Sequence, residues 1–257
     1  MRRLVLEQPA SRAAIFAARL ALFAVVVTIY GLIVVRSGQH GPAGLAALGA
    51  GFALAALTLL LAFFGGVAIW RLGLRGARRI VLAVLLGLGL LAAPAWAAMQ
   101  ALTLPQLTDI TTDIDDPPSF SRSRAALAAR SGHVPRELPR EARAPQREAY
   151  QQLIPIITEL PAENAFDVAL KAARSLGWQV VEHAPPGGRT GSGRIEAVAT
   201  TRVLRFNDDV TIRIRPRVNG SRIDIRSASR IGRHDLGANA RRIQAFADEV
   251  QLMLAAR

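Results

Sequence analysis

The sequence contains no cysteine, and aromatic residues make up only 5% of its 257 positions. The absence of thiols excludes disulfides, thiolate catalysis and zinc–thiolate sites. The hydrophobic fraction is nevertheless 51%, and much of it is alanine, leucine and valine within the first hundred residues. This distribution is typical of membrane spans and not of one large soluble core.

Acidic residues are scarce in the N-terminal part of the chain. Residues 1–108 hold nine arginines and one glutamate, whereas residues 109–257 hold 23 basic and 18 acidic residues. Most of the net charge of +13 therefore lies beside apolar segments, where basic residues set membrane topology. Because no nucleic-acid recognition motif accompanies the charge, we expect no nucleic-acid partner.

Three uncharged stretches occupy residues 20–35, 37–70 and 80–104. A helix needs about 20 residues to cross the ~30 Å of hydrocarbon in a bilayer. The second and third stretches meet this length, and the first meets it when residues 13–18 are added and Arg19 extends to the headgroups. We therefore predict a three-helix transmembrane region over residues 1–108. None of the spans carries a charge at mid-depth, which argues against an ion path.

Arginines alternate around the predicted spans. They are frequent before the first span, rare in the first loop, frequent in the second loop, and absent after the third span until Arg122. This pattern predicts a cytoplasmic N-terminus and a C-terminal domain on the periplasmic side of a bacterial inner membrane. Cleavage near Ala97, which ends a small-x-small triplet, is the alternative for the third span.

Small residues repeat every four positions in the second span, at Ala47, Gly51 and Ala55. Such spacing lets helix backbones approach closely. We expect the three spans to pack on one another there, and a dimer interface is the alternative.

Residues 109–149 are predicted to be a juxtamembrane acidic motif followed by a linker. Asp109, Asp113, Asp115 and Asp116 indicate a solvated acidic collar. A Ca²⁺ site is the alternative, although the spacing matches no EF-hand loop. Residues 121–149 are rich in arginine, alanine and proline without periodicity, which is typical of a flexible linker.

From Tyr150 onward the pattern predicts an α+β soluble domain over residues 150–257. Apolar residues recur at helical spacing in residues 162–176 and 240–253, and alternate with polar ones in the last three predicted strands. We predict the order β-α-β-β-β-β-α, with two helices on one face of an antiparallel sheet and the other face in water. The predicted strands cover residues 153–157, 178–181, 195–199, 210–214 and 222–227.

The dipeptide Asn219-Gly220 predicts a two-residue hairpin between the last two strands. The register that follows places Arg215 opposite Asp224, Asp209 opposite Arg230, and Arg213 opposite Arg226. Two facing arginines are unfavourable unless a negative group lies between them. Either Glu196 or a neighbouring acidic residue bridges them in a salt-bridge ladder, or they form a fork for an anionic lipid or glycan group.

Polar residues also gather where the last strand meets the last helix. Ser227 and Ser229 share the apolar side of their strand and need hydrogen-bond partners, and Asp235 is a plausible helix cap. We expect a cap-and-turn network that closes the junction between strand and helix, and a polar pocket is the alternative. The predicted ligand-binding residues are Arg213, Arg226, Arg230, Asp209, Asp235 and Asn239.

Catalysis has little support, since neither G-x-S-x-G nor H-E-x-x-H occurs. We predict no catalytic residues, metal or cofactor. A hydrolase or metal-dependent enzyme using Asp208, Asp209, His234 and Asp235 is the alternative.

Several of these segments together resemble a known family. They are Asp109-Ile-Thr-Thr-Asp113, Asp116-Pro117-Pro118, Gly177-Trp178, Phe206-Asn207-Asp208-Asp209, and the arginine–serine block from Arg226 to Ile243. Over residues 108–257 the chain is similar to the bacterial domain-of-unknown-function family 1499, although a proline usual soon after Tyr150 is replaced by Gln151. The resemblance implies an envelope protein of undetermined activity. We therefore expect a membrane-anchored domain that binds an anionic envelope component or a partner protein, with a structural accessory subunit as a further alternative.

Overall fold

The computed structural model describes residues 9–38, 41–187 and 191–256. The chain divides into two compact units, residues 1–99 and 100–257. Arg2 and Arg3, which contribute to the predicted topology, and Gly188 of the predicted loop after the second strand lie outside the described residues.

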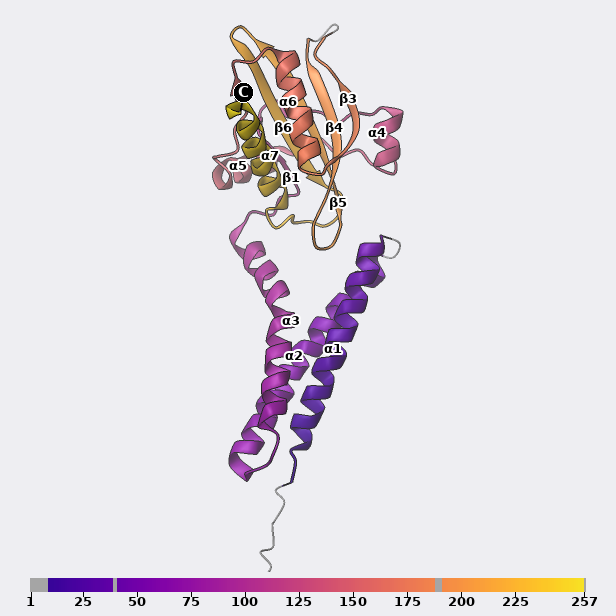
Figure 1. Cartoon of the computed structure of the whole chain (residues 1–257), viewed down its shortest axis with the longest axis vertical. Coiled ribbons are helices and arrows are strands. Elements are labelled where there is room, and N and C mark those ends of the chain that lie inside the picture. Colours follow the sequence, from indigo (N-terminus) through magenta and orange to yellow (C-terminus); the bar gives the residue numbers. More distant parts are fainter. Residues whose placement is uncertain (1–8, 39–40, 188–190, 257) are drawn as a thin grey trace, which may run out of the picture. The chain divides into compact units, whose positions relative to one another are not determined.

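The first unit is built from three long helices, labelled in Figure 1: α1 (Arg12–Ser37), α2 (Gly41–Leu72) and α3 (Ala77–Thr103). Each is long and apolar enough to cross a membrane. Ser11 caps α1, since its hydroxyl accepts a hydrogen bond from the N–H of Ala14 at 3.3 Å. The three candidate spans expected from the uncharged stretches are therefore present.

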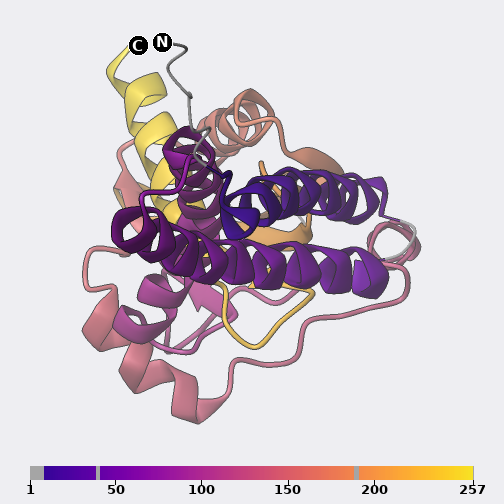
Figure 2. The same ribbon diagram turned by 90° about the horizontal axis from the view of Figure 1, so that it is seen from below.

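Small residues bring α1 and α2 close together, and the two helices lie side by side in Figure 2. A Cβ atom on Gly51 would lie 2.2 Å from Oγ1 of Thr28, and one on Gly31 would lie 2.6 Å from the backbone nitrogen of Leu48. Ala55 is fully buried. The small residues of α2 thus pack within the chain, as predicted.

The second unit is organised around one antiparallel sheet in the order β1-β6-β5-β4-β3. The short strand β2 also pairs with β6, next to β1 along the same edge. The strands are β1 (Asp109–Thr111), β2 (Ile156–Thr158), β3 (Gln179–Ala184), β4 (Gly193–Thr200), β5 (Asn207–Arg217) and β6 (Gly220–Ser229). The helices of this unit are α4 (Arg124–Ala129), α5 (Arg140–Ala149), α6 (Ala162–Ser175) and α7 (Ala238–Ala255).

Helices α6 and α7 cover one face of the sheet, as Figure 1 shows. The alternating apolar residues of β4, β5 and β6 point toward them, and Ile195, Ile212 and Ile225 are fully buried. Trp178 stacks on Phe246 of α7 with ring centroids 5.6 Å apart. This face has the composition of an ordinary hydrophobic core.

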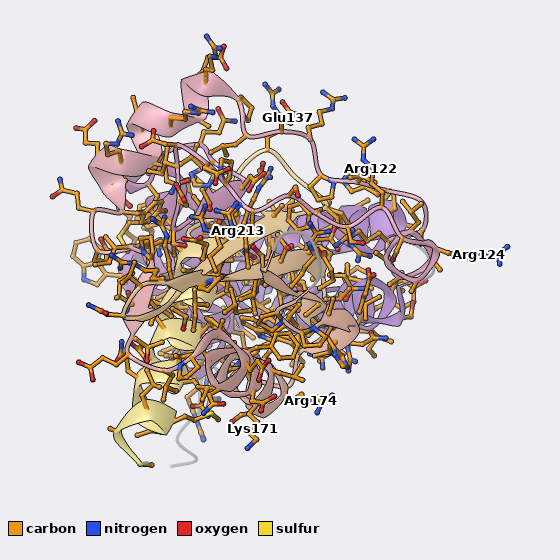
Figure 3. The ribbon with its side chains drawn as sticks, turned by 90° about the horizontal axis from the view of Figure 1, so that it is seen from above. Arg122, Arg124, Glu137, Lys171, Arg174 and Arg213 are labelled. Carbon is orange, nitrogen blue, oxygen red and sulfur yellow. The ribbon has the colours of Figure 1, made fainter. Side chains whose placement is uncertain are left out.

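The opposite face is also covered, by residues 112–149, so the prediction that this face lies in water is wrong. Its polar side chains are among the most buried of the chain, with Glu196, Asp209 and Asp224 all at 0% exposure. Figure 3 shows Arg213 on this side of the sheet, whereas Lys171 and Arg174 of α6 lie on the other side.

The expected solvated collar and linker are therefore packed on the sheet. Phe120, Arg130 and Gln146 from this segment are all buried. The side-chain amide of Gln146 donates to the carbonyl of Thr111 at 2.6 Å and accepts from its N–H at 3.3 Å, which satisfies the free edge of β1. Residues 112–149 show no periodicity because they cover the polar face of the sheet through individual contacts and not through one regular element.

The register of the β5–β6 hairpin differs by two residues from the prediction. The turn residues are Val218 and Asn219, and Arg217 pairs with Gly220. Gly220 has φ of 112°, and a Cβ atom there would lie 2.0 Å from the carbonyl oxygen of Thr158. A glycine is therefore needed at position 220 because the end of β2 approaches the backbone closely there, and it is not one of the two turn residues.

The shift by two residues keeps every side chain on its predicted face but changes its partner. Arg213 lies opposite Asp224, and Arg226 lies opposite Thr211 on β5 and Thr111 on β1. The two arginines do not face each other, so the predicted fork between them is wrong.

We predict that Gly220→Ala destabilises the protein by about 3 kcal/mol, from a left-handed backbone plus overpacking against Thr158. The matched control is Gly177→Ala, where φ is 72° but nothing lies within 4 Å of an added Cβ, so only the backbone cost of about 1 kcal/mol applies. Urea denaturation of the detergent-purified protein measures both. Equal losses would contradict the assigned role of Gly220.

Candidate functional site

The centre of the covered face is a buried ion-pair network around Arg130, which follows α4. Its guanidinium pairs with Glu196 on β4, donates to the carbonyl of Ser121 at 2.7 Å, and lies 3.3 Å from Asp209 on β5. Glu196 also accepts from the hydroxyl of Thr211 at 2.9 Å and from the N–H of Ser121 at 3.0 Å. The segment before β2 thus supplies the cation that neutralises buried carboxylates of the sheet.

A second buried pair joins the edge strand β1 to β6. Arg226 holds Asp109 at 2.6 Å and donates to the carbonyls of Pro118 and Arg136 at 3.2 and 2.6 Å. The guanidinium carbons of Arg226 and Arg130 lie 5.0 and 5.1 Å from the ring centroid of Phe120, a distance at which cation–π attraction contributes. One aromatic ring therefore serves both arginines.

The pKa values of three carboxyl groups of this face shift in different directions. Burial raises the pKa of Asp109 and of Glu196 above the usual carboxyl range, although Arg226 and Arg130 oppose the shift. Hydrogen bonds from Ser123 and Ser121, both 2.7 Å long, lower the pKa of Glu182 at the margin of the face. The arginines thus counteract the effect of burial on the pKa of Asp109 and Glu196.

Three further arginines converge at the hairpin end of the same face, and we call Arg213, Arg215 and Arg222 with Asp113, Asp116 and Asp224 the arginine cluster. Asp113 accepts from the three guanidiniums at 3.3, 3.0 and 2.6 Å. The buried Asp224 contacts the same three at 3.1, 2.8 and 2.7 Å. Two carboxylates from distant parts of the chain thus hold the guanidiniums in fixed positions.

The third carboxylate of the cluster is different, because Asp116 is 65% exposed. It contacts Arg213 at 3.1 Å and Arg215 at 2.8 Å, and these two arginines are themselves partly exposed at 20% and 31%. Burial alone would lower the pKa of Arg215, but Asp224, Asp113 and Asp116 raise it. The cluster therefore offers charged donors at the surface.

Two clefts flank the arginine cluster. Arg213 lines a cleft of about 390 Å³ together with Ser119, Glu182, Ser192 and Arg194. Asp113 and Arg222 line another of about 370 Å³ together with Arg147 and Tyr150. Polar side chains of both signs face these clefts, which suits a ligand with an acidic group and hydroxyls.

Asp208 and Asp209 point to opposite faces of the sheet. Asp209 lies on the covered polar face, where it accepts from Arg230 at 2.6 Å. Asp208 lies on the helix face and pairs with Arg242 of α7 at 2.5 Å. Burial raises the pKa of Asp208, while Arg242 opposes the rise. Adjacent positions in a strand cannot cooperate at one site when their side chains diverge in this way.

The junction between β6 and α7 is closed by a hydrogen-bond network. Asp235 accepts from the N–H groups of Gly237 and Asn239, both at 2.9 Å. The N-cap residue of α7 is Gly237, so the prediction that Asp235 is the N-cap residue is wrong. Asn239 accepts from the hydroxyl of Ser227 at 2.8 Å and donates to Ser229 at 2.9 Å and to the carbonyl of Thr108 at 3.0 Å. The contacts have the form of the predicted cap-and-turn network.

His234 is likewise occupied by backbone contacts. Its Nδ1 accepts from the N–H of Leu236 at 2.9 Å, and its Nε2 lies 3.2 Å from the carbonyl oxygen of Leu104. Asp208 and Asp209, which belong to the alternative enzymatic site, are held by arginines on opposite faces of the sheet, while His234 lies 4.0 Å from Asp235 and contacts the backbone. Within residues 9–38, 41–187 and 191–256, no group of three or more side chains is arranged to hold a metal ion.

The site predicted from sequence is thus divided among four places. Arg213 belongs to the arginine cluster, Arg226 to the β1 pair, and Asp209 with Arg230 to the central network. Asp235 and Asn239 belong to the junction between β6 and α7. Sequence analysis did not assign Asp113, Asp116 and Arg130 to a site, because an acidic run beside a span and an arginine in an aperiodic segment resemble solvated residues. The signal that could have found them is the excess of charged residues on the polar side of β5 and β6. If that side of the sheet is buried, its charged residues need partners.

Comparison with known families identifies one match. The model of the family described as "Protein of unknown function (DUF1499)" matches residues 109–250, which is more than half of the chain. Neither the curated proteins nor the solved structures contain a match.

We predict that Arg130→Met lowers the free energy of unfolding by about 3–5 kcal/mol, because the carboxylate of Glu196 remains buried without its cation. Adding Glu196→Gln to this variant should restore most of the loss. The control is Arg147→Met, whose pair with Asp115 is 62% and 81% exposed and should contribute less than about 1 kcal/mol. Urea denaturation at neutral pH provides the values, and a similar cost at both positions would show that the buried pair has no special role.

Proposed function

The chain belongs to the DUF1499 family of proteins of unknown function, and we propose that it is a membrane-anchored envelope protein whose second unit binds an anionic component through the arginine cluster. The anchor is the first unit, which lies in the bacterial inner membrane with the N-terminus in the cytoplasm. The second unit then lies in the periplasm, where acidic glycans, anionic lipid headgroups and acidic surfaces of partner proteins are available.

Three long apolar helices support the anchoring part of the proposal. The alternation of arginines around them supports the orientation, since Arg12, Arg75 and Arg78 belong to the basic segments and no basic residue follows α3 before Arg122. A bridge between Ala10 and Arg75 brings the N-terminal segment and the second loop to one end of the helices. The basic segments thus share one side.

The single observation that carries the binding part is the position of Asp116. This exposed carboxylate is held by Arg213 and Arg215 at 3.1 and 2.8 Å, while buried Asp224 fixes the same two guanidiniums from below. Asp116 occupies the place that a carboxylate or phosphate oxygen of a ligand would take. A ligand would displace Asp116 and leave the rest of the cluster in place.

The geometry supports binding over catalysis. Asp208, Asp209, His234 and Asp235 are each engaged with arginines or backbone groups.

The anchoring part predicts the behaviour of topology reporters. Alkaline phosphatase, which is active only outside the cytoplasm, should be active when fused after Arg257 and inactive when fused after Arg75 in the second loop. A cytoplasmic fluorescent reporter should give the reverse pattern. A fusion after Arg257 that functions only inside the cell would contradict the proposed location.

The binding part predicts that Asp116→Asn increases affinity for anionic ligands about fivefold, because it removes a competing carboxylate worth about 1 kcal/mol. Glucuronate and glycerol phosphate serve as probes of a glycan acid and a lipid headgroup, and calorimetry on the detergent-purified protein measures the affinity. The control is Asp115→Asn, which changes the neighbouring exposed aspartate that pairs with Arg147 outside the cluster. If neither variant differs from the wild type in affinity for these probes, the arginine cluster is a set of structural ion pairs and not a binding site.

A further inference from the structure

Three connections meet at one end of the sheet, opposite the β5–β6 hairpin. The pairs Thr200–Asn207 and Asp208–Ser229 place the β4–β5 loop and the β6–α7 loop at this end. The pair Asp109–Ala228 places the start of β1 there as well. We call residues 104–108, 201–206 and 230–237 the proximal end.

The proximal end is fastened to the residues that follow α3. The carbonyl of Leu104 lies 3.2 Å from Nε2 of His234, and the carbonyl of Leu107 accepts from the N–H of Asp235 at 2.9 Å. The carbonyl of Thr108 accepts from the N–H of Ser229 at 2.8 Å. Since α3 ends at Thr103, the loop that contains His234 contacts the chain at the first residue beyond the helix.

This attachment restricts where the proximal end can lie if α3 crosses the bilayer, as proposed above. A chain advances at most ~3.6 Å per residue, so the five residues from Leu104 to Thr108 reach no farther than about 18 Å. The β6–α7 loop, which contacts these residues, therefore remains within this reach of the end of α3, and the β4–β5 loop lies at the same end of the sheet.

The exposed residues of these two loops are apolar and basic. The β4–β5 loop has the sequence Thr-Arg-Val-Leu-Arg-Phe, and the β6–α7 loop begins Arg-Ile-Gly-Arg-His. Val203 is 66% exposed and Ile231 is 56% exposed. Arg202, Arg205 and Arg233 are also exposed, and neither residues 201–206 nor 230–234 include an acidic residue.

The β4–β5 loop is held in a defined shape. The N–H of Arg205 donates to the carbonyl of Thr201 at 3.1 Å, and the N–H of Phe206 donates to the hydroxyl of Thr201 at 2.8 Å. Arg205 has φ of 57°, which a residue with a side chain adopts only when its surroundings require it. A closed loop that exposes valine between two arginines at its tip is a specific surface feature.

We propose that the proximal end docks on the bilayer surface, with Val203 and Ile231 in the interfacial layer and Arg202, Arg205 and Arg233 on the phosphates of anionic phospholipids. Apolar side chains enter the boundary between headgroups and acyl chains, and adjacent basic side chains add electrostatic attraction to anionic lipid. The inference rests on the proposed anchoring and adds a second attachment, which would fix the orientation of the second unit on the membrane.

The absence of cysteine permits a direct test with single-cysteine variants of the full chain in lipid vesicles. Val203→Cys carries a polarity-sensitive dye, and brominated lipids report its depth by quenching. The matched control is Val218→Cys in the hairpin at the other end of the sheet, which is 101% exposed. In vesicles rich in phosphatidylglycerol, we expect the dye at position 203 to be quenched at least about threefold more than at position 218.

Two further variants separate the possible failures. Leu85→Cys in α3, 65% exposed, is quenched if that helix crosses the bilayer. Quenching at position 85 with equal, weak quenching at positions 203 and 218 overturns docking alone. Absence of quenching at position 85 overturns both docking and the anchoring on which it rests.

The identity of the lipid is tested by the arginines. Replacing Arg202, Arg205 and Arg233 with glutamine, or substituting phosphatidylcholine for phosphatidylglycerol, should abolish most of the difference between positions 203 and 218. A difference that survives both changes overturns the assignment of anionic lipid.

Discussion

The second unit depends on one constraint, which is that every charge buried on the polar face of its sheet must meet an opposite charge. Glu196, Asp209 and Asp224 lie on that face without exposure to water. Removing carboxylates from water is costly unless cations and hydrogen bonds replace the lost hydration. Arg130 and the arginines of β5 and β6 replace it, and Arg130 comes from a segment that forms no part of the sheet.

This constraint explains why residues 109–149 belong to the folded unit. The segment supplies Arg130 for Glu196, Asp109 for Arg226, and Asp113 for the arginine cluster. Its large buried apolar side chains are Ile110, Phe120 and Leu138, so ion pairs provide much of its attachment to the sheet. The family match begins at Asp109, the first residue of β1, so the matched region includes the covering segment together with the sheet.

The same arrangement links stability to the proposed function. The buried carboxylates of the arginine cluster hold the guanidiniums of Arg213 and Arg215 in place, and exposed Asp116 meets them from the solvent side. A preorganised cation pair loses little side-chain entropy when an anion binds. The structural ion pairs therefore prepare the surface on which the proposed ligand would bind.

Sequence reasoning predicted the parts of the fold that depend on local pattern. Apolar length identifies α1, α2 and α3, and alternation identifies β4, β5 and β6, because these signals come from burial along one element. It failed where a residue acts through a distant partner. Gly220 was assigned to the turn, but its conformation serves the contact with Thr158.

The predictions for several charged residues were wrong for a related reason. Sequence analysis placed Arg130 and Asp113 in solvated segments, because their ion-pair partners lie far away in the chain and a single sequence does not reveal such pairs. The acidic motif was predicted to be a solvated collar, because its arginine partners lie about a hundred residues later in the chain. The pairs Asp209–Arg230 and Arg215–Asp224 were predicted and are present as ion pairs, whereas Arg213 does not face Arg226.

Hydrogen–deuterium exchange of the full-length protein in detergent tests the central claim most directly. If residues 109–149 close the polar face, amides such as that of Thr112, which donates to Ile225, and that of Ser121, which donates to Glu196, should exchange as slowly as those of β6. If the amides of residues 109–149 exchange within seconds while those of β6 are protected, the account is contradicted. The segment would then be a solvated linker that does not cover the polar face.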